Sequence, residues 1–167
     1  FDSVSAFALP VGLEWDFSLL ESEGSATVVN RVISLSGSLS FGEVTVGQTS
    51  TRTLTITNNG ATPLTVIGIS YPAGFSGSWN GGMISAGGNQ IITVTFSPTD
   101  ASSYTGNITI DSNATSGTNT LAISGTGVAA PSRILALSGN LSFGEVEIGQ
   151  TATRTLTIAN NGNSVLT

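Results

Sequence analysis

The side chains of this chain that could take part in catalysis are carboxylates, Tyr and Ser or Thr hydroxyls. Its 167 residues include ten Asp and Glu, four Arg, and no His, Cys or Lys. Without His or Cys, the chain lacks the usual zinc ligands, a thiol nucleophile and a Ser–His pair. The remaining catalytic chemistry is that of paired carboxylates, as in glycoside hydrolysis. We therefore expect a protein that is not an enzyme and that uses no cofactor.

Half of the carboxylates lie near the start of the chain. After Asp2, the acidic residues of this region are Glu14, Asp16, Glu21 and Glu23. Carboxylate oxygens are the ligands that calcium prefers, so Glu14 and Asp16 are candidate calcium ligands. Their spacing matches no calcium-binding loop, which favours a solvated strand face over a metal site.

Three aromatic residues gather around a glycine-rich segment in the middle of the chain. Tyr71, Phe75 and Trp79 could form a platform on which a sugar ring stacks. Large aromatic side chains in the middle of a domain more often belong to its core. The core interpretation is favoured, and a glycan remains a possible partner.

Charge and hydropathy exclude two other classes of partner. The net charge is −6 and the isoelectric point is near 4.1. An acidic chain with few cations cannot form the basic patch that phosphate backbones or anionic lipids require. No apolar run approaches the ~20 residues that span a bilayer. We expect no nucleic-acid partner and no direct membrane insertion.

The elements that position these residues are predicted to be strands, beginning with residues 7–19. In the sequence FALPVGLEWDFSL every second residue is large and apolar. These residues are Phe7, Leu9, Val11, Leu13, Trp15, Phe17 and Leu19. Strict alternation predicts a strand with one buried face, although Pro10 removes one donor from its ladder. At ~3.3 Å per residue, this strand would have about twice the usual length.

An internal repeat organises the rest of the chain. Residues 31–65 return as residues 133–167 at a constant offset of 102, with 24 of 35 positions identical. A period near 100 residues indicates whole domains in tandem rather than a solenoid. We expect an N-terminal extended segment over 1–30, a complete domain over 31–128, a linker over 129–132, and the first strands of a second, incomplete domain over 133–167.

The complete domain is predicted to be all-β. Short alternating segments are separated by turn signals such as Asn59-Gly60 and Asn80-Gly81-Gly82. Seven or eight such strands in about 98 residues are typical of an immunoglobulin-like β-sandwich. The alternation changes phase between Val66 and Ile67, which predicts a β-bulge there.

Several short motifs resemble the ASH type of immunoglobulin-like domain, named for abnormal-spindle and hydin proteins. They include Phe41-Gly42-Glu43-Val44, Asn58-Asn59-Gly60, Val94-Thr95-Phe96-Ser97-Pro98 and Ser124-Gly125-Thr126-Gly127. The resemblance covers roughly residues 35–128 and the start of the second copy. It implies a non-catalytic sandwich on an exported, multi-domain protein, similar to the "choice-of-anchor" repeats of bacterial surface proteins. It carries over no active site.

Two segments lack partners in this scheme: the apolar strand 7–19 and the incomplete domain 133–167. Soluble proteins avoid exposed apolar faces and unpaired strand edges. We therefore expect another segment or another chain to cover these two segments. In one interpretation, residues 1–30 are the tail of a preceding domain in a longer array. In another, residues 7–19 are a donor strand that completes the sandwich of a neighbouring subunit. In a third, they fold back on their own sandwich.

The first two interpretations agree on function. They predict a non-enzymatic structural module of an extracellular or cell-surface fibre or rod. Its expected partners are identical subunits or neighbouring immunoglobulin-like domains. The alternative is a glycan- or protein-binding module of a larger secreted adhesin or hydrolase.

Overall fold

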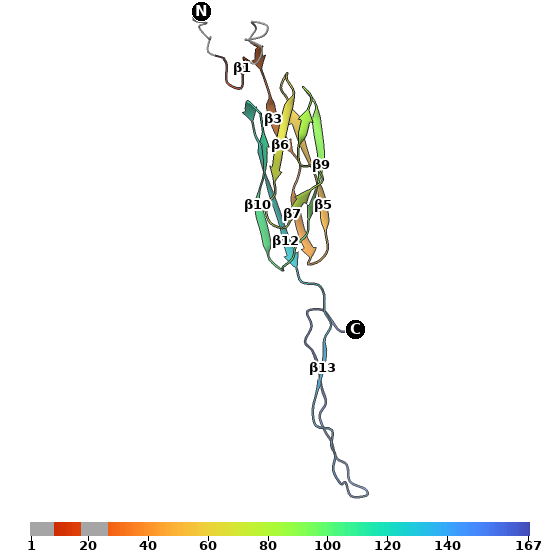
Figure 1. Cartoon of the computed structure of the whole chain (residues 1–167). Helices are drawn as coiled ribbons and strands as arrows, with labels where there is room; N and C mark the ends of the chain where they lie inside the picture. Colours follow the sequence, from red (N-terminus) through yellow and green to blue (C-terminus); the bar gives the residue numbers. More distant parts are fainter. Residues whose placement is uncertain (1–8, 18–26) are drawn as a thin grey trace, which may run out of the picture. The chain divides into compact units, whose positions relative to one another are not determined.

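The chain is all-β in a computed structural model that describes residues 9–17 and 27–167, apart from the side chain of Asp16. It divides into two compact units, Phe1–Val128 and Ala129–Thr167. Figure 1 shows strands in both units. Among the described residues, no helix has the length and apolar character needed to cross a membrane.

The first unit contains a sandwich of two five-stranded sheets. One sheet has the order β4 (Ser40–Thr45), β12 (Thr120–Val128), β10 (Ser103–Ser112), β6 (Leu64–Ser70) and β8 (Gly82–Ile84). The other has the order β11 (Ser116–Gly117), β3 (Val32–Ser36), β5 (Ser50–Asn58), β9 (Asn89–Phe96) and β7 (Phe75–Gly77). The predicted immunoglobulin-like sandwich is confirmed, with three very short edge strands in addition to the expected ones.

Most neighbouring strands are antiparallel, and two pairs at the sheet edges are parallel. β12 runs parallel to β4, and β11 runs parallel to β3. The register between β6 and β10 shifts where Asp111 pairs with Gly68 and Ser112 pairs with Val66. Ile67 is therefore the extra residue of a β-bulge and is exposed, which confirms the predicted change of phase.

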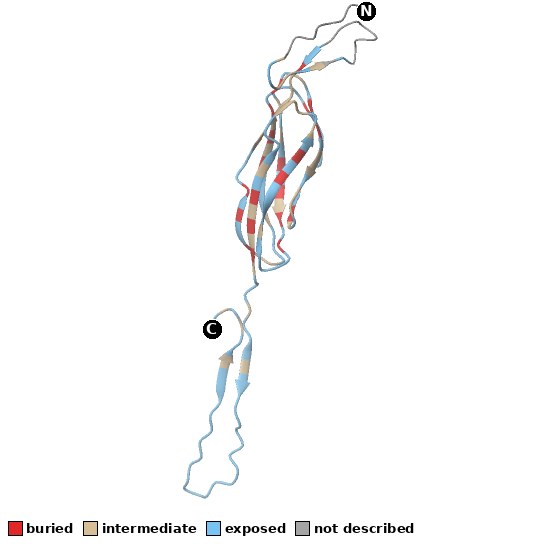
Figure 2. Cartoon of the chain, turned by 90° about the vertical axis from the view of Figure 1, so that its left-hand side faces the viewer, coloured by how far each residue is buried: buried red, intermediate tan, exposed pale blue. Residues whose placement is uncertain are grey.

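The core lies between the two sheets, and the alternation of the strands selects its members. In β5, Leu54 and Ile56 point inward, while the alternating threonines, Thr53, Thr55 and Thr57, lie on the outer face. Ile92, Val94 and Phe96 of β9 and Ile108 and Ile110 of β10 are likewise completely buried. Figure 2 shows this alternation as red bands along the strands of the sandwich.

Four aromatic rings pack together in one part of this core. The Phe75 ring stacks on the Phe96 ring with centroids 4.7 Å apart, and Phe41 contacts both. The Tyr104 ring meets Phe96 edge-on at 5.2 Å. Its hydroxyl accepts hydrogen bonds from the Thr99 and Asp100 N–H groups at 3.1 and 3.0 Å. Tyr104 thus fixes the turn before β10, in the manner of the tyrosine corner of immunoglobulin folds.

The prediction of one continuous strand over 7–19 is wrong for its described part. A turn at Val11–Gly12 interrupts it, with the Leu13 N–H donating to the Pro10 carbonyl at 3.2 Å. The strand that follows is short, β1 (Glu14–Asp16), and pairs with β2 (Thr27–Val29) as an antiparallel hairpin. Gly12 has a φ of +88°, a conformation that favours glycine and breaks the pleat. Phe7 and Leu19 lie outside the described residues.

The second unit is an antiparallel ribbon of two strands, β13 (Leu135–Ser138) and β14 (Thr157–Asn160). Leu135 pairs with Asn160, and Leu137 pairs with Ile158. The same register joins Ile33 to Asn58 and Leu35 to Ile56 in the first unit. The pairing of β3 with β5 is therefore reproduced at the constant offset of 102 residues.

Candidate functional site

Of the acidic side chains near the start of the chain, the structure describes that of Glu14, whereas that of the second calcium candidate, Asp16, lies outside the described part. Glu14 lies on β1, is exposed, and approaches Arg31 with 3.6 Å between carboxylate oxygen and guanidinium nitrogen. The described residues contain no group of three His, Cys, Asp or Glu side chains that could hold a metal ion. The geometry gives Glu14 an ion pair at the surface, and such a pair contributes ~0–1 kcal/mol to stability.

The three candidate platform residues do not form an exposed surface. Phe75 is buried in the core, and Tyr71 and Trp79 pack against that core while half-buried. The Tyr71 hydroxyl is buried and has no hydrogen-bond partner in the described part of the chain. Burial raises its pKa above the usual value of 10. Because the Phe75 ring is buried and the other two rings pack against the core, the core interpretation fits these residues better.

The segment 9–17 is attached to the sandwich of its own chain. The Thr115 hydroxyl donates to the Gly12 carbonyl at 2.6 Å. Leu9, Leu13 and Trp15 are half-buried, whereas Val11 is fully exposed and Phe17 is half exposed. This arrangement is nearest to the interpretation in which the segment folds back on its own sandwich.

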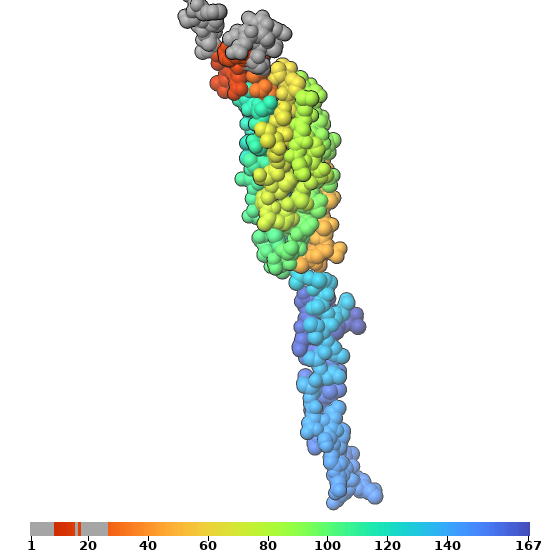
Figure 3. Space-filling view, viewed as in Figure 1, coloured from red at the N-terminus to blue at the C-terminus, as the bar shows by residue number. Residues whose placement is uncertain are grey.

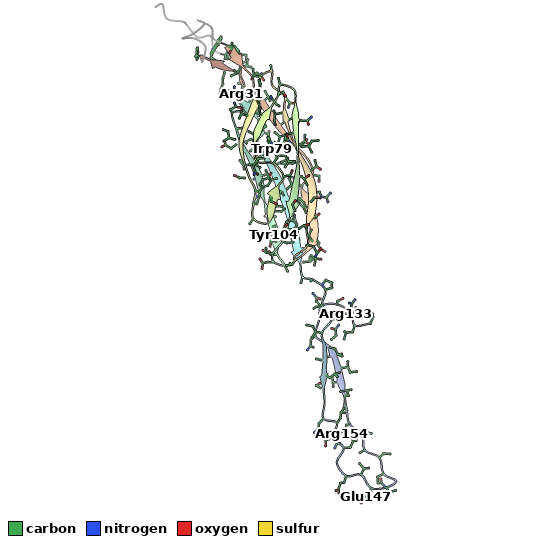
Figure 4. All side chains as sticks on the ribbon, turned by 45° about the vertical axis from the view of Figure 1, so that its right-hand side comes forward. Arg31, Trp79, Tyr104, Arg133, Glu147 and Arg154 are labelled. Atoms are coloured by element: carbon green, nitrogen blue, oxygen red, sulfur yellow. The ribbon has the colours of Figure 1, made fainter. Side chains whose placement is uncertain are left out.

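Arg31 organises the end of the sandwich to which this segment is attached (Figure 4). The Arg31 side-chain Nε donates to the Asn113 carbonyl at 2.7 Å, and the Arg31 backbone N–H donates to the Thr115 hydroxyl at 3.1 Å. The Asn113 side-chain oxygen in turn accepts from the Thr65 N–H at 2.8 Å. Sequence reasoning did not identify this network, because its members are 48 or more residues apart in the chain.

The turn after β5 in the first unit and the turn after β14 in the second unit have the same hydrogen bonds. Asn58 Oδ1 accepts from the Gly60 N–H at 3.0 Å, and Asn160 Oδ1 accepts from the Gly162 N–H at 3.0 Å. The Asn58 amide donates to the Thr62 carbonyl at 2.8 Å, and the Asn160 amide to the Ser164 carbonyl at 2.7 Å. The local structure of the hairpin is therefore set by its own 35 residues.

Burial distinguishes the two copies. Ile33, Leu54 and Ile56 of the first unit are 1%, 0% and 0% exposed, whereas their counterparts Leu135, Leu156 and Ile158 are 57%, 46% and 64% exposed. In Figure 2 the second unit carries no red residue, and Figure 3 shows a narrow ribbon of exposed side chains there. Its other exposed apolar side chains include Leu137, Leu141, Phe143, Val146, Ile148 and Val165. An apolar sheet face of this extent is typical of an interaction surface.

One edge of this ribbon is also unpaired among the described residues. In the first unit, β5 pairs with β3 on one side and with β9 on the other, from Ser50↔Phe96 to Thr57↔Asn89. In the second unit, β14 pairs with β13 alone. The ribbon therefore presents both an apolar face and the backbone groups that β9 occupies in the first unit. We call these two features together the open face, defined by Leu135, Leu137, Leu156 and Ile158 and by the free edge of β14.

Comparisons with known proteins agree with the fold. Residues 27–119 match the family model described as ASH, abnormal spindle-like microcephaly-associated, ASPM-SPD-2-Hydin. No curated protein sequence matches the chain.

Three solved structures show the range of similar folds. The ASH/PapD-like domain 7 of human CEP192 is 19% identical, with a TM-score of 0.47; the match covers 59% of this chain and 86% of that domain. The Vibrio cholerae VesB protease is 20% identical, with a TM-score of 0.45, over 56% of this chain and 31% of the protease. The CsuC–CsuE chaperone–tip subunit complex of Acinetobacter baumannii is 14% identical, with a TM-score of 0.38, over 80% of this chain and 72% of the matched one.

The family match covers more than half of the chain and includes every strand of the β-sandwich except β12. ASH domains are non-catalytic modules. The chain belongs to the ASH (ASPM-SPD-2-Hydin) family.

Proposed function

We propose that this chain is a non-enzymatic structural module of an extracellular or cell-surface fibre or rod, whose subunits join by completing one another's β-sheets. The observation that carries the proposal is the open face of the second unit. The counterparts Ile33, Leu54 and Ile56 in the first unit are buried, and Leu35 packs against the same core while partly buried. The side chains of the open face are therefore suited to a protein interior rather than to water.

The cost of leaving this face in water supports an assembly role. Burying a Leu or Ile side chain contributes about 1.5–3 kcal/mol. Leu135, Leu156 and Ile158 all have substantial exposed area to lose. An unpaired strand edge beside an apolar face is a template for strand addition.

The finer step of the proposal is that residues 7–19 of a neighbouring copy occupy the place that β9 has in the first unit. From Ile92 onward, β9 contributes an inward apolar residue at every second position, and the sequence of residues 7–19 has a large apolar residue at every second position. Val11 and Phe17 are exposed in the subunit and would become buried in the assembly. Donation requires that the Val11–Gly12 turn opens and that the hydrogen bond from Thr115 to Gly12 breaks. Because the contact joins two different surfaces, it propagates as an open filament.

Electron microscopy and light scattering of the full chain test this proposal with three double variants. Leu135→Ser with Ile158→Ser removes the open face, and Val11→Ser with Phe17→Ser removes the donor. Met83→Ser with Ile91→Ser is the matched control, since both residues are exposed and apolar but lie on the sandwich of the first unit.

We expect filaments from the unmodified chain and from the control, and monomers from the other two variants. Loss of filaments only in the Leu135/Ile158 variant would retain the open face as an assembly surface and reject the N-terminal donor. Monomers of the unmodified chain at all concentrations would contradict assembly altogether.

The glycan-binding alternative has less support. It was based on Tyr71, Phe75 and Trp79, which belong to the core or pack against it.

A further inference from the structure

The chain contains three Asn-Gly pairs, and each lies in a different environment. Such a pair can undergo deamidation. They are Asn59-Gly60, Asn80-Gly81 and Asn161-Gly162. In an Asn-Gly pair the glycine nitrogen can attack the asparagine side chain, because glycine has no Cβ to hinder the approach. The attack requires a mobile backbone and a glycine N–H that is not engaged elsewhere.

Two of the pairs are held in the same tight turn. The Gly60 N–H donates to Asn58 Oδ1, and the Gly162 N–H donates to Asn160 Oδ1, both at 3.0 Å. The Asn59 N–H also donates to the Val32 carbonyl at 2.7 Å, and the Asn59 amide donates to the Ser34 hydroxyl at 2.9 Å. These bonds keep the glycine nitrogen and the asparagine backbone in place.

The third pair lies in an open connection between β7 and β8. Asn80 is exposed and belongs to no strand. Neither the Asn80 side chain nor the Gly81 N–H takes part in any of the hydrogen bonds found outside the strand ladders of the described residues. We infer that Asn80 is the site at which this protein undergoes spontaneous deamidation through a succinimide.

The reaction needs only water. The Gly81 nitrogen, after loss of its proton, forms a bond to Cγ of Asn80, and the bond from Cγ to the amide nitrogen breaks. The departing nitrogen takes up one proton, which balances the proton lost from the Gly81 nitrogen, and leaves as ammonia. Water then adds to one of the two ring carbonyls and breaks one ring C–N bond. The products are aspartate or isoaspartate, and in isoaspartate the side-chain methylene becomes part of the backbone.

The position of this pair gives the modification a structural consequence. A Cβ on Gly81 would lie 2.8 Å from the Val66 carbonyl oxygen, so the backbone passes close to β6 here. β8 is an edge strand of three residues that pairs only with β6, and it carries the buried Ile84. An extra backbone atom between Asn80 and Gly82 is therefore expected to loosen β8 and expose Ile84.

Prolonged incubation of the full chain, followed by peptide mapping with mass spectrometry, tests the inference. The peptide that contains Asn80 should gain the mass of an amide-to-acid conversion about tenfold faster than those with Asn59 or Asn161, the factor expected for one hydrogen bond to be broken. Asn80→Gln should abolish conversion at this position, since its longer side chain disfavours ring closure.

A second variant tests the cause of the difference. Asn160→Ala removes the acceptor of the Gly162 N–H in the exposed hairpin. Asn161 should then react at a rate that approaches that of Asn80. Equal rates at the three pairs in the unmodified chain, or a fastest reaction at Asn59 or Asn161, would overturn the inference.

Discussion

The β3–β5 pair and the β13–β14 pair have nearly the same sequence, the same register and the same turn, yet only the first is buried. Ile56 is 0% exposed and Ile158 is 64% exposed, although both lie at the same position of the ribbon. The comparison separates two contributions to this fold. Strand pairing and turn geometry come from the local 35 residues, whereas the core comes from the strands of residues 66–128 that cover them.

The largest expected effect is on the free energy of unfolding, when a leucine that is buried in the first unit and exposed in the second is truncated. Leu54→Ala should lower the free energy of unfolding of the first unit by about 2–5 kcal/mol, because it removes buried methyl groups and leaves a cavity. Leu156→Ala should change it by less than about 0.5 kcal/mol. Urea unfolding followed by tryptophan fluorescence measures both, since Trp15 and Trp79 belong to the first unit. Equal losses would show that both ribbons are buried in one cooperative unit.

A smaller difference in stability is expected for the asparagines that end β5 and β14, Asn58 and Asn160. The buried Asn58 amide nitrogen lies within hydrogen-bonding distance of the Thr62, Ile84 and Ser85 carbonyls. Within the described part of the chain, the Asn160 amide nitrogen donates to the Ser164 carbonyl alone. Asn58→Ala should cost about 1–3 kcal/mol, since it leaves buried carbonyls unpaired. Asn160→Ala should leave the unfolding of the first unit unchanged in the same urea titration. A loss below about 0.5 kcal/mol for Asn58→Ala would show that water replaces the amide.

The smallest effect concerns two tyrosines of residues 66–128, the part of the sandwich that covers β3 and β5. Burial raises the Tyr71 pKa, while a hydrogen bond with the Thr99 hydroxyl and one from the Asp100 N–H lower the Tyr104 pKa. The stability linked to Tyr71 is present below the unfolded-state pKa of about 10 and is lost as the pH rises through its folded pKa. The contribution of Tyr104 has the opposite sign and appears as the pH rises through its folded pKa.

Urea midpoints between about pH 9 and 11 measure these contributions. Tyr71→Phe should flatten the alkaline loss of stability, and Tyr104→Phe should steepen it. Identical slopes for the two variants would contradict the assigned environments.

Much of the sandwich could be predicted from the sequence because its strands follow simple rules. The alternation of Leu54 and Ile56 identifies an inward face, and the change of phase at Ile67 identifies a bulge that the register confirms. These features depend on residues close together in the chain, so a local pattern is sufficient to reveal them.

The predictions that the structure corrected depend on distant contacts or on single backbone angles. The alternation of residues 7–19 suggested one strand, but Gly12 adopts a positive φ and its carbonyl is bound by Thr115, 103 residues away. The sequence also gave no signal for the network around Arg31 or for the corner that Tyr104 forms with Thr99 and Asp100.

Amide hydrogen exchange at increasing protein concentration tests the central proposal, that the open face binds a second copy, most directly. Residues 50–57 pair with β9 in the first unit, and residues 55–57 also pair with β3, so their protection should not depend on concentration. Protection of residues 152–160 should be low in dilute solution and should rise as subunits associate. Protection of these residues that stays low at every concentration, or that is high even at the lowest, would contradict the proposal that a neighbouring copy covers the open face.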